Sequence, residues 1–545
     1  YDWHFIAETP EEAIRLGLEA GVDLQLYDFP HDVWQKAIAH LIESGSMKMS
    51  VLDTACRRVL RMKFALGLFE NPYTDEKRAD KILRCPEHLT TAEKIAEKSI
   101  VLLKNDGLLP IRKDLRSVAV IGPAADTVSY GDYTETRGRK GGVSVLDGIR
   151  AAVSPETEVL YERGCNFLGQ ALHPFDPSML RDENGESGLT GHYYNGPVPQ
   201  GEPVQVRTDR TVNFNWIFAL PHPALDANCF SVVWTGSVVM PRTMDGCIGL
   251  STQDSMRLYV DDKLLIDGWG KDKSADQALD FHFEAGRTYK IRIEFVNDRR
   301  GARVIFGENF DRTDLNLPGR QLELVQAVYA TGTPVVLVLQ SGRPVTANWE
   351  NDHLPAILEA WFPGEQGGTA IAKTLFGDAA PGGRLPITFP RSVGQIPCHY
   401  SRRPGGGKRY VEMDWLPLYP FGYGLTYTTF AYRDMALSRS VIDPQDTVTV
   451  SVTVTNTGKY TGDAVPQLYV RDMFSSVVKP ERQLAAFRRL TLAPGESRRV
   501  ELTVGPKQLR TLGPDYVWRV EPGKFELQLG DNAENILLRA DLTVE

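Results

Sequence analysis

Cysteine is scarce in this chain, and long apolar runs and an excess of positive charge are missing from it. The six cysteines lie far apart, with no CxxC pair and no histidine at metal-ligand spacing; they are Cys56, Cys85, Cys165, Cys229, Cys247 and Cys398. This spacing argues against a structural zinc site and against a disulfide framework. We expect free or buried thiols, no structural metal and no cofactor.

The charge and hydropathy patterns exclude two kinds of partner. No apolar run approaches the roughly 20 residues of a membrane-spanning helix, and the first residues, YDWHFIAETP, lack a basic segment followed by an apolar one. The formal net charge is -9, with both signs interspersed. Neither nucleic acid nor a membrane is therefore expected as a partner. The sequence leaves open a cytoplasmic or a secreted or periplasmic location, and it leaves open a homo-oligomer.

At 545 residues the chain is too long for one hydrophobic core, and about three to four domains are expected. The first segment predicts a helix, EEAIRLGLEAG, that ends at Gly21, then a short strand, VDLQLY, and helices over 33–45 and 50–69. The last of these helices carries Val59, Leu60, Phe64 and Leu66 for burial, beside basic residues whose expected place is a solvated face: Arg57, Arg58, Arg61 and Lys63.

The rest of the chain alternates between α/β and all-β patterns. AEKIAEKSIVLLKN predicts a helix leading into a strand, and Val118 to Ile121 predicts a strand closed by Gly122 and Pro123, a turn placed where open α/β sheets bind ligands. From about residue 188 the period changes to two, which is typical of a β-sandwich. Helix and strand patterns resume in PGRQLELVQAVYATG and TPVVLVLQSG. LPAILEAWFPGEQGGTAIAKTLFG is expected to be helical before and after its Pro-Gly break, and the last ~100 residues suit one immunoglobulin-like sandwich.

The stretch RVIFGENFDRTDLNLPGRQ, residues 303–321, carries the clearest candidate for chemistry. A short apolar run ends in a glycine and is followed at once by Glu308, Asp311, Arg312 and Asp314. Composition favours Glu308 as a solvated loop acid that pairs with Arg312, because exposed charges are the common case. The alternative is a catalytic acid at the end of a sheet strand.

The order of motifs resembles glycoside hydrolase family 3, and specifically its members with an inserted PA14 domain. ACRRVLRMKFALGLFENPY resembles the helix that closes the family's barrel, and AEKSIVLLKNDGLLPI resembles the entry to its α/β sandwich. VAVIGPAAD, GDY at 131–133, GRPVTANWE, AWFPGEQGG, LFGDAAPGGRLPITFP and PFGYGLTYTTF follow in the family's order. GLTGHYYNG, FSVVWTGSVVMP and SMRLYVDDKLLIDGW resemble PA14.

The resemblance implies a multidomain fold of α/β and all-β parts. It divides the chain into a C-terminal remnant of a (β/α)8 barrel at 1–72, the first part of an α/β sandwich with a parallel sheet and flanking helices at 73–187, and a PA14 β-sandwich at 188–307. The second part of the α/β sandwich follows at 308–400, a linker at 401–430 and a fibronectin-III-like sandwich at 431–545.

The resemblance also implies an activity, the retaining hydrolysis of β-glycosides from the non-reducing end. Retention needs two carboxyl groups, one as nucleophile and one as acid and then base, and the acid must keep its proton until it meets the leaving oxygen. In similar members the acid is a Glu just before a DR pair and an L-x-LP segment, so this role carries over to Glu308. Asp311, Arg312 and Asp314 are then a local ion-pair network.

The sugar is left open by the sequence. A β-glucosidase acting on short β-glycosides or aryl and alkyl β-glycosides is the leading interpretation, a β-xylosidase or another β-glycosidase of the family is the alternative, and a non-catalytic carbohydrate-binding protein is the alternative from another class. Trp216, Trp234 and Trp269 could stack on a sugar next to the cleaved bond, but sandwich core is favoured for each of them.

The sequence departs from the family pattern in two places. The nucleophile is an Asp in an SDW-like motif, and Asp2 invites that role; however, the segment from His4 to Ala7 resembles the stretch just beyond the nucleophile loop, which places the nucleophile before Tyr1. We therefore expect the rest of the barrel and the Asp nucleophile on a second chain or a missing segment. In addition, only RVIFG stands where the family has strand and helix before Glu308. Either residues are missing between about Phe306 and Glu308, or the α/β sandwich lacks a strand; missing residues are favoured, because the loss of an interior strand would leave buried backbone groups unpaired.

Overall fold

The computed structural model describes residues 6–25, 29–131, 141–165, 175–212, 214, 220–226, 229–250, 255–269, 277–297, 313–405 and 410–545. The chain separates into two compact units, Tyr1–His88 and Leu89–Glu545, which are described one at a time. Within the described part of the chain, no helix combines the length and the apolar character needed to cross a membrane.

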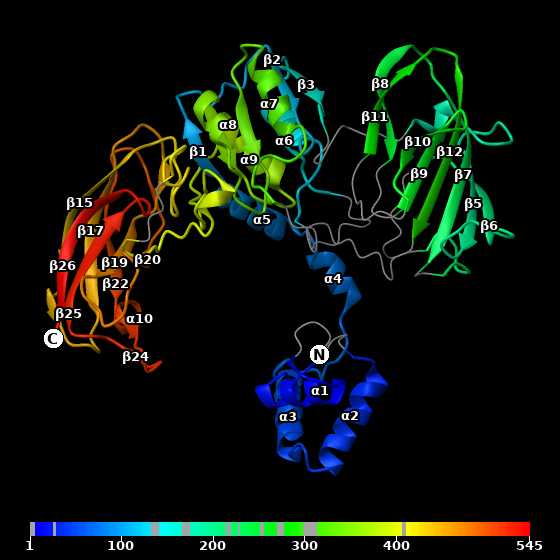
Figure 1. Ribbon diagram of the computed structural model, residues 1–545. Coiled ribbons are helices and arrows are strands. Elements are labelled where there is room, and N and C mark those ends of the chain that lie inside the picture. Colours follow the sequence, from blue (N-terminus) through cyan, green and yellow to red (C-terminus); the bar gives the residue numbers. More distant parts are fainter. Residues whose placement is uncertain are drawn as a thin grey trace. The chain divides into compact units, whose positions relative to one another are not determined.

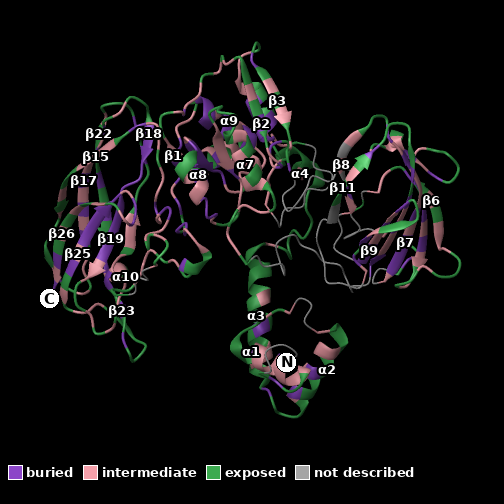
Figure 2. Cartoon of the chain, turned by 45° about the horizontal axis from the view of Figure 1, so that its top comes forward, coloured by how far each residue is buried: buried purple, intermediate pink, exposed green. Residues whose placement is uncertain are grey.

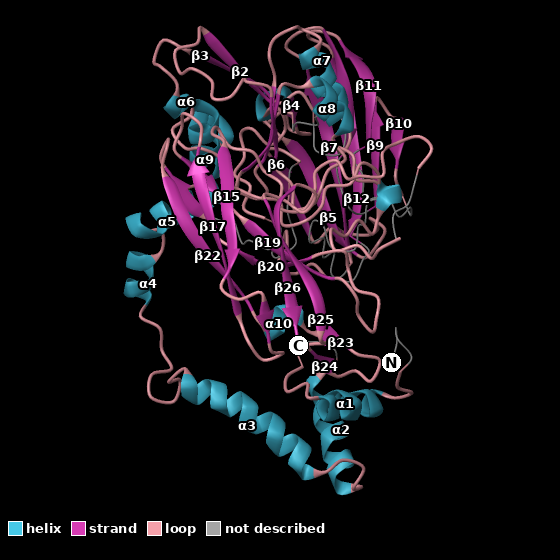
Figure 3. Ribbon diagram, turned by 90° about the vertical axis from the view of Figure 1, so that its left-hand side faces the viewer, coloured by secondary structure: helices cyan, strands magenta, loops and turns pink. Residues whose placement is uncertain are grey.

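The described elements of the first unit are helices (Figure 3). They are α1 (Pro10–Ala20), α2 (His31–Glu43), α3 (Met49–Ala65) and α4 (Glu76–Ile82). As predicted, α1 ends at Gly21, whose φ of 97° is the left-handed conformation that a helix C-terminus favours. A small core joins the first three helices through Ile14, Leu18, Leu41 and Ala55.

Two predictions for this unit are wrong. Residues 22–25 of the predicted strand VDLQLY form no regular structure, and the remainder of that stretch lies outside the described residues; a lone strand would leave its backbone groups unpaired. Leu60, Phe64 and Leu66 are exposed rather than buried, at 43%, 61% and 67%. The helical core reaches α3 only through its first half, so its second half is largely exposed (Figure 2). Its basic residues are solvated, as predicted.

The α/β region of the second unit has helices on both faces of its strands (Figure 1). In chain order its elements are α5 (Pro86–Ser99), β1 (Val101–Asn105), β2 (Ser117–Ile121), α6 (Val145–Ala152), β3 (Glu158–Glu162), α7 (Gln321–Tyr329), β13 (Val336–Leu339), α8 (Asn348–His353), β14 (Ala356–Glu359) and α9 (Gly367–Phe376), followed by a 3-10 turn (Val393–Gln395). One core cluster joins α5, α6 and α9 to one face of these strands. A second cluster packs α7, α8 and the segment around Phe389 and Tyr419 on the other face.

The strands form two described sheets, β1-β14-β13 and β2-β3. β13 runs parallel to β14, and β2 runs parallel to β3, which confirms the predicted parallel strands, while β1 runs antiparallel to β14. The prediction that PAILEAW is helical is wrong, because Ala356 to Glu359 form β14 and are fully buried. Periodicity cannot separate a short apolar helix from a strand that is covered on both faces.

The interrupting region is an all-β insert, as the period-two pattern predicts. A 3-10 turn (Pro177–Met179) leads into β4 (Leu180–Arg181), β5 (Leu189–Asn195), β6 (Gln205–Asp209), β7 (Phe230–Val239), β8 (Met244–Leu250), β9 (Ser255–Val260), β10 (Lys263–Asp267), β11 (Gln277–Phe283) and β12 (Thr288–Asn297). A seven-stranded sheet runs β10-β9-β12-β7-β5-β6 with β4 on β7, and β11 pairs with β8.

Trp234 belongs to the core of this insert, which confirms the core interpretation for that residue. It is 2% exposed, and its indole N–H donates to Asp209 Oδ2 at 2.7 Å. The same carboxylate accepts the hydroxyl of Tyr193 at 2.5 Å and the Arg207 guanidinium at 2.7 Å. Every strong donor in this buried cluster therefore has an acceptor, and Trp234 offers no open face for a sugar.

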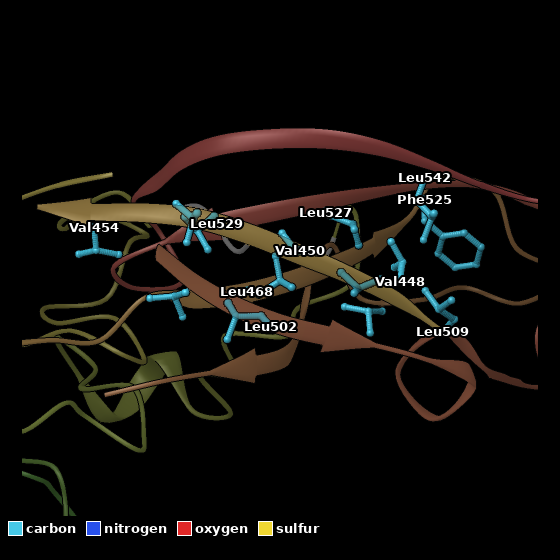
Figure 4. Packing of buried hydrophobic residues seen from close by; sticks show 14 of the residues in the cluster. Val448, Val450, Val454, Leu468, Leu502, Leu509, Phe525, Leu527, Leu529 and Leu542 are labelled. Carbon is cyan, nitrogen blue, oxygen red and sulfur yellow. The ribbon is translucent and has the colours of Figure 1, made fainter. Parts of the chain in front are cut away.

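The last β-sandwich closes the chain. Its elements are β15 (Phe430–Leu437), β16 (Val441–Ile442), β17 (Val448–Asn456), β18 (Gly462–Ala464), β19 (Gln467–Asp472), β20 (Gln483–Phe487), β21 (Leu490–Leu492), β22 (Ser497–Val504), α10 (Pro506–Leu509), β23 (Thr511–Leu512), β24 (Trp518–Arg519), β25 (Gly523–Gly530) and β26 (Ile536–Val544). The sheets β15-β17-β22 and β16-β26-β25-β19-β20 enclose its core. Along β17 every second residue is buried, and Figure 4 shows Val448, Val450 and Val454 among the packed leucines.

Asp463 joins this sandwich to the α/β region. Its carboxylate accepts Lys98 Nζ from α5 at 2.6 Å, Arg489 at 2.9 Å and Thr491 Oγ1 at 2.6 Å. Burial alone would raise the pKa of Asp463, but the hydrogen bonds from Lys98, Thr491 and Arg489 outweigh it and hold the pKa below its ordinary value of 3.8. The charged form is therefore the one that the fold stabilises.

We predict that Asp463→Asn lowers the free energy of unfolding by about 2 kcal/mol at pH 7. The loss is moderate because Lys98 and Arg489 lose their negatively charged partner but stay partly solvated. Because the folded-state pKa is depressed, this contribution is present above pH 3.8 and is lost as the pH falls below that value. Urea unfolding at pH 7 and at pH 3 measures it. The control is Asp541→Asn, an exposed carboxylate on β26; equal losses in both variants would contradict the assignment.

Candidate functional site

The candidate site is the carboxyl edge of the parallel strands, where the loops after β2 and β13 come together. From β2 the chain passes through α6 to its neighbour β3, and from β13 it passes through α8 to its neighbour β14. The Gln340 side chain, just after β13, donates to the carbonyl oxygen of Ala124, just after β2, at 3.4 Å. The loops that follow β2 and β13 are therefore in contact at the carboxyl ends of parallel strands, which is where open α/β sheets bind ligands.

The turn predicted at Gly122 and Pro123 lies at this edge. The N–H of Gly122 donates to Glu162 O at the end of β3. The carbonyl of Ala125 accepts the N–H of Leu146 in the first turn of α6, and Ser144 caps that helix by accepting from Asp147 N. These hydrogen bonds fix the loop after β2 against α6.

Glu359, the last residue of β14, is a buried acid that the sequence pattern did not predict. It has no exposed surface, and its Oε1 accepts the N–H of Trp361 at 2.8 Å. Within the described part of the chain, its Oε2 finds no hydrogen-bond partner. Burial raises the pKa of Glu359 to about 8, against an ordinary value of 4.5. The carboxyl group is therefore neutral at pH 7 and holds the turn after β14.

The turn after β14 holds an unusual backbone. Trp361 has a φ of 58°, a left-handed conformation that a bulky residue adopts only when its surroundings impose it. The hydrogen bond to Glu359 and the packing of the Trp361 ring against Phe389, with centroids 6.0 Å apart, supply that constraint. Gly364 N then donates to Ser129 O at 2.9 Å, which ties the turn to the loop after β2.

The segment that follows the candidate acid returns to the same edge. The carbonyl of Leu315 accepts the N–H of Thr346 at 2.9 Å, and Thr346 Oγ1 donates to Asn316 Oδ1 at 2.6 Å. Leu317 packs into the core cluster that contains Leu339 and Val345. The L-x-LP segment is thus fixed to the loop that follows β13.

The predicted site residues are only partly covered by the described structure. Glu308, Asp311, Arg312, Asp2 and Trp216 lie outside the described residues, as does the interval from Phe306 to Glu308. Asp314 is described, and its Oδ1 accepts the N–H of Asn316 at 2.9 Å. The Trp269 ring lies under the guanidinium of Arg257, with 4.7 Å to the ring centroid.

Cysteines and possible metal ligands add little to this edge. Cys56, Cys85, Cys165 and Cys398 are free thiols, as predicted. Among the described residues, no group of three or more His, Cys, Asp and Glu side chains could hold a metal ion.

We predict that Glu359→Gln makes the protein less sensitive to alkaline pH. Because the folded-state pKa is raised from 4.5 to about 8, the contribution of Glu359 to stability is full below pH 4.5 and is lost as the pH rises toward 8. The wild type should lose roughly 3–5 kcal/mol over this interval relative to the variant. Urea unfolding from pH 5 to pH 8.5 measures the two slopes. Glu323→Gln, on an exposed carboxylate of α7, is the control; parallel slopes in wild type and Glu359→Gln would contradict the assignment.

Two family models match the chain. Residues 100–427 match the Glycosyl hydrolase family 3 C-terminal domain, a range that contains the whole candidate edge. Residues 464–533 match the Fibronectin type III-like domain, within the last β-sandwich.

Similar proteins extend the match over nearly the whole chain. A periplasmic β-glucosidase of Salmonella typhimurium is 32% identical over 98% of this chain, and a β-xylosidase of Formosa agariphila is 33% identical over 99%. A β-glucosidase of Rhizobium radiobacter is 31% identical, and the match covers 100% of this chain and 72% of the relative. The chain spans 60% and 62% of the length of the first two relatives.

Solved structures agree with these matches. A β-glucosidase from Erythrobacter marinus superposes with a TM-score of 0.71 at 29% identity, covering 100% of this chain and 62% of that one. A β-glucosidase from Kluyveromyces marxianus in complex with glucose gives 0.73 at 25% identity, covering 99% and 72%. With its α/β region and its last β-sandwich both matched, the chain belongs to glycosyl hydrolase family 3.

Proposed function

We propose that the complete protein is a retaining, exo-acting β-glycoside hydrolase, with β-glucosidase as the leading activity and β-xylosidase as the alternative. One observation carries the proposal. The segment that follows Glu308 is fixed, through Leu315 and Asn316, to the loop after β13 at the candidate edge. The names of the relatives, β-glucosidase and β-xylosidase, support the same class of substrate.

In the proposed reaction Glu308 is the acid and then the base. Its proton passes to the glycosidic oxygen while the bond from that oxygen to the anomeric carbon breaks and a carboxylate nucleophile bonds to that carbon. Water then attacks the glycosyl ester, Glu308 takes the proton of the water, and the sugar leaves with its β configuration. The nucleophile is not assigned to a residue of this chain.

The domain arrangement remains part of the proposal. We assign residues 1–72 to the barrel, 73–187 and 308–400 to the α/β sandwich, 188–307 to a PA14 insert and 431–545 to the fibronectin-III-like sandwich, with 401–430 as linker. The helical character of 10–65 and the antiparallel sheet of 180–297 support these assignments. A PA14 domain beside the active site would narrow it and favour short substrates over polymers. A second chain or a further segment would supply the remainder of the barrel.

Replacing Glu308 tests the acid–base role in the full-length enzyme. We predict that Glu308→Ala lowers the hydrolysis of disaccharides by about 100-fold or more, since their leaving group needs a proton. Azide should partly restore turnover of an aryl glycoside with a good leaving group, because this anion attacks the glycosyl ester without a general base. Glu323→Gln is the control and should keep full activity. Full disaccharide activity in Glu308→Ala would refute the role.

Activity on four aryl glycosides, the β-glucoside, xyloside, galactoside and N-acetylglucosaminide, shows which sugar the enzyme prefers. We predict the highest kcat/KM on the glucoside, and a higher value on the xyloside would instead select β-xylosidase. Binding of sugars without turnover of any of the four would contradict an enzyme and favour a non-catalytic carbohydrate-binding protein.

A further inference from the structure

Phe362 is a half-exposed aromatic ring at the centre of the candidate edge. It is 42% exposed, although its neighbours in β14 are fully buried. A Cβ atom added to Gly342, in the loop after β13, would meet the Phe362 ring at 2.6 Å, and one added to Gly131, beyond β2, would meet it at 3.7 Å. The ring therefore lies between the loops that follow β2 and β13.

Three constraints hold the ring in this place. The left-handed backbone of Trp361, bound through its N–H to Glu359, sets the direction of the turn. Gly364 N donates to Ser129 O on the following side of the ring. Gly342 leaves room for the ring edge, because a larger residue would clash with it. A strained turn that presents an apolar ring to solvent is the kind of outlier that points to function.

The chemistry of retaining hydrolysis says which part of a substrate such a ring would meet. The nucleophile attacks the anomeric carbon from the side opposite to the departing oxygen, while the acid faces that oxygen. Asn316 lies eight residues after Glu308, so we expect residues of the loop that holds Asn316 to face the leaving group. Gly342, where an added Cβ would meet the Phe362 ring, and Thr346, which holds Asn316, belong to the same loop after β13.

We propose that Phe362 is a specificity residue that stacks on the leaving-group sugar or aryl ring of the substrate. The proposal rests on the proposed function. An aromatic face in a fixed position suits the apolar C–H face of a pyranose or an aryl group, and it offers no charge that would select one linkage.

The test compares substrates whose leaving groups differ in size. For Phe362→Ala we expect kcat/KM on a β-linked disaccharide to fall about tenfold, mainly through KM, since a lost stacking contact is worth about one factor of ten. Turnover of the glycosyl fluoride of the same sugar, whose leaving group is a single fluoride ion, should stay within about twofold of wild type. Phe362→Tyr should retain most of the disaccharide activity.

A control and two contrary outcomes complete the test. Phe474→Ala removes an 81% exposed phenylalanine ring from the last β-sandwich. It should leave the hydrolysis of both the disaccharide and the glycosyl fluoride unchanged. An equal loss on disaccharide and fluoride, with Phe362→Tyr no better than Phe362→Ala, would assign a purely structural role and overturn the inference alone. Absence of turnover of every β-glycoside by the wild type would overturn the proposed function, and the inference with it.

Discussion

The burial of β14 is the constraint on which the α/β region depends. Every residue from Ala356 to Glu359 is fully buried, with β1 antiparallel on one side and β13 parallel on the other. Side chains of β14 alternate between the core cluster of α5, α6 and α9 and the cluster of α7, α8 and Phe389. A strand covered in this way cannot shift by one residue without moving its apolar side chains to the wrong face.

The same constraint reaches the candidate site through Glu359. Since β14 ends in a residue that has no contact with water, its carboxyl group is neutral at pH 7 and bonds to backbone instead of solvent. The bond from the Trp361 N–H to Glu359 fixes the turn after β14, and the bond from the Ala360 N–H to Leu339 O at 2.9 Å holds this turn to the end of β13. Packing in the core thus sets the geometry of the edge, and the edge sets the position of Phe362 and of the loop that holds Asn316.

Much of this fold can be predicted from local patterns in the sequence. The amphipathic helices 10–20, 31–43 and 49–65, the apolar strands β2 and β13 and the period-two β insert form as their spacing predicts. The pattern fails where an element depends on neighbours. PAILEAW looks helical until β1 and β13 are known to flank it, and VDLQLY has no described strand beside it.

The candidate site was less predictable, for a related reason. Gly122 and Pro123 lie where the α/β pattern places them. The buried acid Glu359 is not predicted, because the segment PAILEAW is expected to be a helix, and a helix would leave the Glu359 side chain in solvent. A glutamate inside a run of fully apolar residues was the available signal, and assigning that run to a strand would have revealed a buried acid. Phe362 depends on contacts with Gly131 and Gly342, which are far apart in the sequence and leave no local pattern.

The central claim is that the candidate edge, where the loops after β2 and β13 meet, binds the glycoside. Hydrogen exchange of the full-length protein, with and without gluconolactone as a sugar-shaped inhibitor, tests it most directly. We predict slower exchange in residues 122–131, 341–346 and 361–364 on binding, and no change in the strands of the last β-sandwich. Protection confined to the last β-sandwich, with none at these three turns, would contradict it.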